Sequence, residues 1–202
     1  NKNPKNSFKL AKELDHYNKE RQMLEKDLLE KILNKTRNNL KDPVLILSGK
    51  NWHEGVIGIV AARLKDKFNK PVIIITLDGD IGKASARSIV GFDIGSIIIS
   101  ATQENILLKG GGHKMAAGFS IKTSNIEKFK NFVFRKFKSI NENLCFEKPL
   151  LLDSIISPSA VNLDFYKKVE LLSPFGSSNP EPKFAIENLK TINGKIVGEK
   201  HI

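Results

Sequence analysis

A strand, a helix and a second strand follow one another directly, and this order constrains the fold most. Residues 44–48 form a short apolar run typical of a buried strand, and residues 72–76 form another, rich in β-branched side chains. Residues 56–68 between them have the small and apolar composition of a closely packed helix. The order predicts a βαβ unit with two parallel strands and a right-handed crossover. Ligands of such sheets bind beyond the carboxyl ends of the strands, where Trp52 and His53 fall.

The residues after this unit are expected to complete one α/β domain. Four segments are predicted in order: a strand at 83–89, a helix from 92 to about 104, a glycine-rich loop at 110–112 and a strand at 116–121. Ser124 and Glu127 match a capping box, and the apolar stripe of the helix that follows runs to Ile140. We therefore predict a mixed sheet flanked by helices, in a domain of roughly 100 residues.

The segments on either side of this domain have a different character. From Ser7, a candidate N-cap, to about Asn39, apolar residues recur every three or four positions, which predicts a long amphipathic linker helix ending before Pro43. A short coiled-coil seam is the alternative. Beyond Cys145 an apolar run, a short amphipathic segment and a proline-rich loop precede an alternating stretch at 183–202. This stretch predicts the opening strands of a β domain, too few to bury a core alone.

The net charge of +11 favours a polyanionic partner such as nucleic acid, although a compositional bias toward Lys, Asn and Ile would also produce it. The single cysteine excludes an internal disulfide and a multi-cysteine zinc site, which fits a reducing compartment. No apolar run is long enough to span a membrane. We expect a cytoplasmic protein with no membrane partner. The first residue is Asn1 and the end has no closing element, so we also expect part of a longer protein.

Several residue types that bind phosphate fall on loops and strand ends of the predicted domain. Arginine offers a planar fork, lysine a point charge and a glycine backbone unobstructed N–H groups. The candidates are His53, Arg87, Ser88, Gly110, Gly111, Gly112, His113 and Lys114. Each has a structural alternative: a packing pair, an internal ion pair, a tight turn or a solvated charge. The four histidines lie far apart without clustered aspartates, so the sequence predicts no metal site in this chain.

Four blocks of the sequence occur in the order seen in a known family. They are residues 52–64, 83–88, 111–121 and 174–182. Together they resemble the RecJ family of bacterial single-strand-specific 5′ to 3′ DNA exonucleases, in the DHH phosphoesterase superfamily. The resemblance implies a linker helix at 1–42, a DHH-associated α/β domain at 43–140, and a crossing segment with an incomplete OB-fold at 141–202.

The resemblance also implies separate roles for this chain and for a catalytic domain outside it. Asp and His ligands for two Mn²⁺ or Mg²⁺ ions would belong to a DHH catalytic domain outside this chain. Arg87 and His113 would hold substrate phosphates beside Gly110–Gly112, with His113 as a catalytic phosphate contact and not a metal ligand. The chain would then bind single-stranded DNA without cleaving it, in DNA repair and recombination, alongside single-strand-binding protein and a helicase. A DHH-family oligoribonuclease, a cyclic-dinucleotide phosphodiesterase and a non-catalytic nucleic-acid-binding module are the alternatives.

Overall fold

The computed structural model describes residues 4–36, 41–140, 150–176, 178–190 and 193–194. The chain forms two compact units, residues 1–148 and residues 149–202. Cys145 and half of the predicted last segment lie outside the described residues. The finer boundaries at residues 42 and 140 stay predictions.

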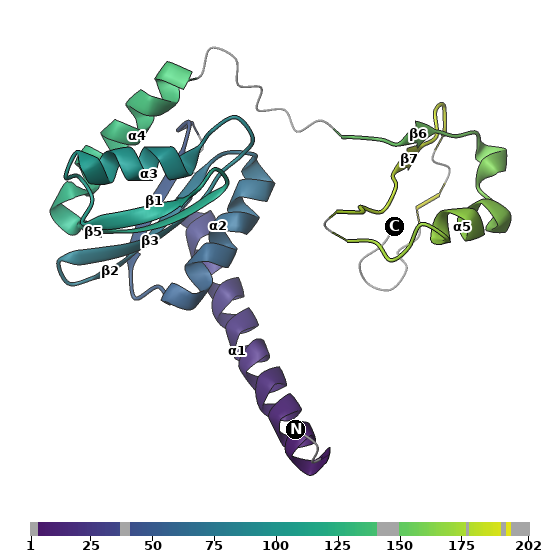
Figure 1. The fold of residues 1–202 in the computed structure, drawn as a ribbon, viewed down its shortest axis with the longest axis horizontal. Coiled ribbons are helices and arrows are strands. Elements are labelled where there is room, and N and C mark those ends of the chain that lie inside the picture. The colour runs from purple at the N-terminus through teal and green to yellow at the C-terminus, as the bar shows by residue number, and fades with distance from the viewer. Residues whose placement is uncertain (1–3, 37–40, 141–149, 177, 191–192, 195–202) are drawn as a thin grey trace. The chain divides into compact units, whose positions relative to one another are not determined.

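A five-stranded mixed sheet organises the first unit, as the sequence predicts (Figure 1). The strand order is β1-β2-β3-β5-β4. The strands are β1 (Leu45–Lys50), β2 (Val72–Asp78), β3 (Ile81–Arg87), β4 (Lys109–His113) and β5 (Ala116–Lys122). The first two are parallel and all other pairs are antiparallel. The parallel pair forms because α2 (Glu54–Phe68) carries the chain from the end of one strand back to the start of the next.

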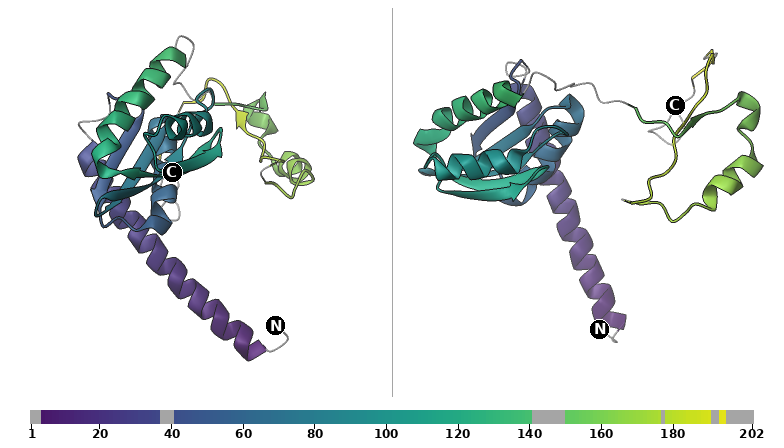
Figure 2. Two further views of the ribbon diagram at one scale, coloured as in Figure 1. Left: turned by 60° about the vertical axis from the view of Figure 1, so that its left-hand side comes forward. Right: turned by 45° about the horizontal axis from the view of Figure 1, so that its top comes forward.

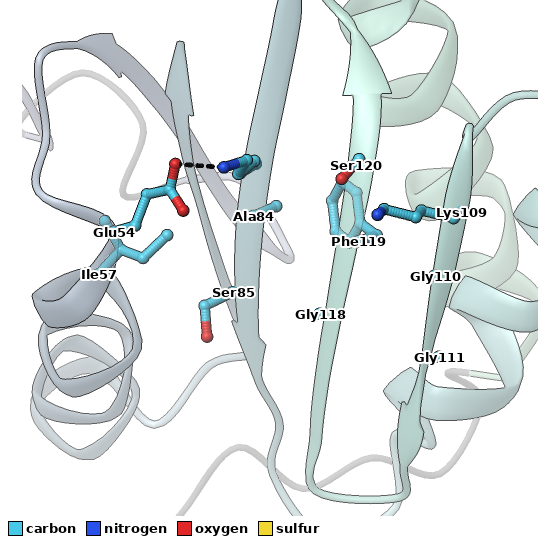
Figure 3. Close-up of a pocket in the computed structure, with 11 residues that line it drawn as sticks. Glu54, Ile57, Ala84, Ser85, Lys109, Gly110, Gly111, Gly118, Phe119 and Ser120 are labelled. Carbon is cyan, nitrogen blue, oxygen red and sulfur yellow. Dashed lines mark ion pairs between the residues drawn. The ribbon is translucent and has the colours of Figure 1, made fainter. Parts of the chain in front are cut away.

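Helices cover the two faces of the sheet unequally. On one face α2 packs on β2 and β3, and Val60 and Leu64 join Leu45, Leu47 and Ile74 in one core. On the other face α3 (Ile94–Gln103) and α4 (Ile126–Ile140) bury a larger, phenylalanine-rich core. On its side of the sheet, α2 covers only β2 and β3. The same side of β5 and β4 therefore has no covering helix, and a pocket opens there (Figure 3).

The long helix α1 (Pro4–Thr36) joins the first unit through its C-terminal half, where Leu28 and Ile32 are buried against α2. The N-terminal half stands clear of the sheet (Figure 2). Its Phe8, Leu14 and Tyr17 side chains are exposed. The helix begins three residues before Ser7, so the prediction that Ser7 caps it is wrong. None of the helices that the structure describes is both long and apolar enough to cross a membrane.

Two further local predictions are wrong. The glycine-rich segment is an edge strand, β4, and not a loop. Its glycines permit close packing: a Cβ on Gly110 would lie 2.6 Å from a methyl carbon of Ile98 on α3. The predicted capping box is a 3-10 turn, η1 (Thr123–Asn125), without a side-chain cap. Asn125 instead donates its amide to the carbonyl of Ile106 (3.1 Å) and so fixes the turn to the preceding loop.

The second unit is small, and its described strands are two residues long. β6 (Ser154–Ile155) pairs in parallel with β7 (Phe184–Ala185). Between them lie a 3-10 turn, η3 (Pro158–Ala160), and helix α5 (Leu163–Glu170), which Asn162 caps. The Phe165 ring packs edge-on against Phe184 at 5.1 Å, so α5 is anchored to the strand pair.

Candidate nucleic-acid interface

Alternation along β3, β5 and β4 sorts their side chains onto two faces. Ala84, Ala86, Ala117 and Phe119 point into the core beneath α3 and α4. The intervening residues therefore share the uncovered side, here called the open face. The ladder register arranges them in three rows across the strands: Lys83–Ser120–Lys109, Ser85–Gly118–Gly111 and Arg87–Ala116–His113. Each outer row begins and ends with a basic side chain, Lys83 and Lys109 in one row and Arg87 and His113 in the other. The middle row carries a single side chain, the hydroxymethyl group of Ser85.

The middle row forms a bare floor. A Cβ on Gly111 would meet no atom within 4 Å, and one on Gly118 would meet only the Ala84 carbonyl oxygen, at 3.6 Å. The pocket above this floor has a volume of about 590 Å³, and Glu54 and Ile57 of α2 form its wall (Figure 3). Both glycines are thus free to let a ligand approach the backbone closely.

The Arg87 guanidinium lies beside the helix that walls this pocket. Its Nη1 donates to the Ser85 hydroxyl (3.1 Å) and to the Ala86 carbonyl (2.9 Å). A Cβ on Gly58 of α2 would lie 3.0 Å from both Nη2 and the Ser85 hydroxyl, so a glycine here makes room for the two groups. No described residue accepts a hydrogen bond from Nε or Nη2, which leaves one edge of the fork for an anion.

His113 is exposed at the end of β4. Its Nδ1 accepts the Met115 N–H at 3.4 Å, so the proton of the neutral ring is on Nε2, which can donate outward. The backbone of His113 is held by α3, because a Cβ on Gly95 would lie 2.9 Å from its carbonyl atoms. The imidazole is therefore carried on a fixed backbone.

Lys114 and Asp93 both lie at the N-terminus of α3. The Asp93 carboxylate accepts the Ser96 N–H at 3.0 Å and caps the helix. That hydrogen bond, with a smaller contribution from the Lys114 charge, lowers the pKa of Asp93 below its usual value. Lys114 is exposed in the turn after β4, and its carbonyl accepts the Ile94 N–H at 3.3 Å.

Lysines define the other end of the open face. Lys83 pairs with Glu54 at 2.7 Å, and this hydrogen bond and charge raise the pKa of Lys83 above its usual value. Lys109 extends along the pocket toward Ser120 (Figure 3). Neither lysine nor Gly118 is among the residues predicted from the sequence. The alternation of Lys83, Ser85 and Arg87 was the available signal, but β4 had to be recognised as a strand to complete it.

Other predicted residues serve the fold. Ser88 is buried, and its hydroxyl donates to the Phe92 carbonyl at 2.5 Å, away from the open face. Gly110 turns toward α3, and a Cβ on Gly112 would collide with Ala116 and Ala117. His53 caps α2, with Nδ1 accepting the Gly55 N–H at 3.1 Å. The structure thus brings Arg87, Gly111 and His113 together on one face and places Ser88, Gly112 and His53 elsewhere, while the backbone of Gly110 still lines the pocket.

A protein-family model described as the DHHA1 domain matches residues 24–139, more than half of the chain. The chain belongs to the DHHA1 domain family. A second family model, described as the RecJ OB domain, matches residues 152–202. The open face lies entirely within the DHHA1 domain.

The curated relatives include single-stranded-DNA-specific exonucleases named RecJ. The protein from Bacillus subtilis is 32% identical over 186 residues, which is 89% of this chain and 23% of the relative. That from Escherichia coli is 32% identical over 206 aligned positions, 96% of this chain and 35% of the relative. The chain thus spans about a quarter to a third of these relatives.

A solved structure of RecJ from Thermus thermophilus in complex with Mn²⁺ superposes with a TM-score of 0.77 at 30% identity. The match covers 92% of this chain and 27% of that one. A second structure of the same protein, with Mg²⁺, gives the same TM-score at 28% identity, covering 90% and 28%. Together with the family matches, this confirms the predicted resemblance to the RecJ family.

Within the described ranges no group of three or more His, Cys, Asp or Glu side chains could hold a metal ion. The residues of the open face are mainly cationic or uncharged, which does not fit a divalent cation.

Proposed function

We propose that the open face of the DHHA1 domain holds the phosphates of single-stranded DNA. The chain would supply the substrate-holding part of a cytoplasmic, single-strand-specific 5′ to 3′ DNA exonuclease of DNA repair and recombination. One observation carries the proposal: the register places a bare floor of Ser85, Gly118 and Gly111 between two rows that end in basic side chains. The RecJ relatives and the RecJ OB domain match support the choice of substrate.

Each basic side chain of the open face has its own role in binding the DNA. Arg87 offers the free edge of its fork to phosphate oxygens, and His113 donates from Nε2 across the sheet. Lys83 and Lys109 act as point charges at the far row, where they attract the next phosphate along the strand. Because the floor lacks side chains at Gly111 and Gly118, a sugar-phosphate backbone can lie directly on the sheet.

The described residues are proposed to bind DNA without cleaving it. The proposal rests on the chemistry of the open face, whose Arg87, Lys109 and His113 side chains suit the binding of an anion. A divalent ion, single-strand-binding protein and a helicase belong to the proposed function of the longer protein, as partners of regions outside the described residues.

Fluorescence anisotropy with a 5′-phosphorylated single-stranded oligonucleotide tests the binding. We expect the affinity to fall with salt, with a log–log slope of about −0.7 per neutralised phosphate. Arg87→Ala should weaken binding about tenfold, which corresponds to a loss of roughly 1.4 kcal/mol of binding free energy. Arg135→Ala is the matched control, because Arg135 is exposed on α4, which covers the opposite face of the sheet. Equal losses in both variants would contradict a site on the open face.

Incubating the purified chain with labelled single-stranded DNA and Mn²⁺ tests the second part of the proposal. The DNA should stay intact over the time in which a full-length relative digests it. Digestion that co-purifies with the chain and survives controls for contaminating nucleases would show that the chain itself cleaves.

A further inference from the structure

A second pocket lies next to the first on the same face of the sheet. Its volume is about 350 Å³, and the two pockets share Glu54 and Lys83. The strand register shows that the two pockets are continuous across the sheet, because Lys83 lies opposite Thr76 of β2, and Thr76 lies opposite Gly49 of β1. The row Lys83–Ser120–Lys109 of the open face therefore extends across β2 to β1. The ion pair between Glu54 and Lys83 stands at the boundary between the pockets.

Trp52 forms an aromatic wall of the second pocket. Its indole ring lies over Gly49, where a Cβ would collide with the ring atoms, so a glycine is required under the ring. The Thr76 hydroxyl donates to the Trp52 carbonyl at 2.7 Å and fixes the loop after β1 to the end of β2. Ile81, 46% exposed, adds an apolar side chain to the lining. The pocket thus offers a fixed aromatic surface beside an aliphatic one.

The second pocket has polar groups that the first pocket lacks. Asp78 contributes a carboxylate and Asn51 an amide, while Glu54, which lines both pockets, is paired with Lys83. Carboxylates repel phosphate and accept hydrogen bonds from the amino groups of bases, as in the pairing of Asp or Glu with the cytosine N4 amino group. Bases also stack on aromatic side chains, and the volume lies in the range of small-molecule sites. The lining therefore matches a nucleobase and not a further phosphate.

We propose that this second pocket binds a nucleobase bearing an exocyclic amino group, cytosine or adenine, of the strand whose phosphates lie on the open face. The inference rests on the proposed function, since the open face supplies the phosphate contacts that bring a base to the pocket. The base lies against Trp52 and donates its amino group to Asp78. The site then prefers cytosine and adenine over thymine, which has a carbonyl oxygen at that position.

Trp52 is the single tryptophan of the chain, so its fluorescence reports on this pocket. Titrations with oligo-dC and oligo-dT of equal length, read by both anisotropy and tryptophan fluorescence, test the proposal. We expect oligo-dC to change the Trp52 emission and to bind about five-fold more tightly than oligo-dT. An oligo-dC with abasic sites should bind by anisotropy but leave the emission nearly unchanged.

Asp78→Asn should bring the ratio of the dC and dT affinities toward one. Asp80→Asn is the control, with the same charge change two residues away at a position that does not line the pocket. Binding by anisotropy with equal affinities and no change in emission would overturn the nucleobase site and leave the proposed function standing. If no oligonucleotide binds, or if Arg87→Ala leaves binding unchanged, the proposed function itself fails.

Discussion

Gly111 of β4 and Gly118 of β5 lie directly opposite each other in the antiparallel ladder, and both leave the open face without a side chain. Gly110 and Gly112, which flank Gly111, turn toward the packed side of the sheet, where a Cβ at either position would collide with its neighbours. The three neighbouring glycines of β4 therefore serve different purposes. Gly111 leaves the open face without a side chain, and Gly110 and Gly112 permit close packing on the other side of the sheet.

This difference predicts opposite effects of two substitutions. Gly111→Val should leave the melting temperature within a few degrees of wild type, because its Cβ meets nothing, but should weaken single-stranded DNA binding about tenfold by covering the floor. Gly110→Ala should lower the free energy of unfolding by about 1–3 kcal/mol through overpacking against Ile98. Thermal melts and anisotropy titrations measure both effects. A Gly111→Val variant that binds DNA normally would show that no ligand approaches the floor.

His113 is predicted to act through the N–H at Nε2. If the proposed function holds, His113→Ala in an exonuclease that contains this chain should lower kcat/KM at least tenfold, because a donor at developing phosphate charge is lost. His113→Gln should recover part of the activity, since its amide also donates. Steady-state kinetics on 5′-phosphorylated single-stranded DNA measure the effect. An unchanged kcat/KM in the alanine variant would assign His113 a purely structural role.

Glu25 links α1 to α2 through a nearly buried carboxylate, which contacts Arg63 and also pairs with Arg21 at 3.0 Å. Glu25→Gln should lower the free energy of unfolding by about 2 kcal/mol, less than for a fully buried pair because both arginines reach solvent. Urea denaturation measures the loss. Glu20→Gln on the exposed side of the same helix is the control and should have no measurable effect. Equal effects would indicate a general change in helix charge.

Asp93 gives the fold a defined dependence on pH. Its pKa is lower in the folded chain than in the unfolded one, so the carboxylate stabilises the fold above the unfolded value of about 3.9. This contribution is lost as the pH falls through the folded pKa. Asp93→Ala should lower the melting temperature at pH 7, and its difference from wild type should shrink in acid. Asp93→Asn should retain much of the cap, because Asn caps helices nearly as well. Melting curves from pH 2.5 to 7 decide the outcome.

Short-range patterns in the sequence predict most of the packed elements. The apolar runs of β1 and β2 and the periodic segment of α2 give the βαβ unit, because burial on both faces requires continuous apolar strands. The α4 stripe is predicted from Phe129, Phe132, Val133 and Phe137, all buried in the structure. These features depend on neighbours within a few residues, so they can be recognised without knowing the tertiary contacts.

Strand β4 is not recognisable in this way. Lys109 to His113 has three glycines and no apolar alternation, and glycine is depleted in strands. The segment is extended because β5 pairs with it and because α3 packs against Gly110. Without that strand, Lys109 and Gly118 had no place in the predicted site.

The sequence by itself determined the basic character of the chain, its α/β class and the family resemblance, since these depend on composition, periodicity and local motifs. The tertiary structure decided which side chains share the open face. A shift of one residue along a strand moves a side chain to the other face of the sheet, and the register follows from contacts between distant segments. Ser85 and Arg87 therefore lie beside Gly111 and His113, while Ser88 is buried against Phe92.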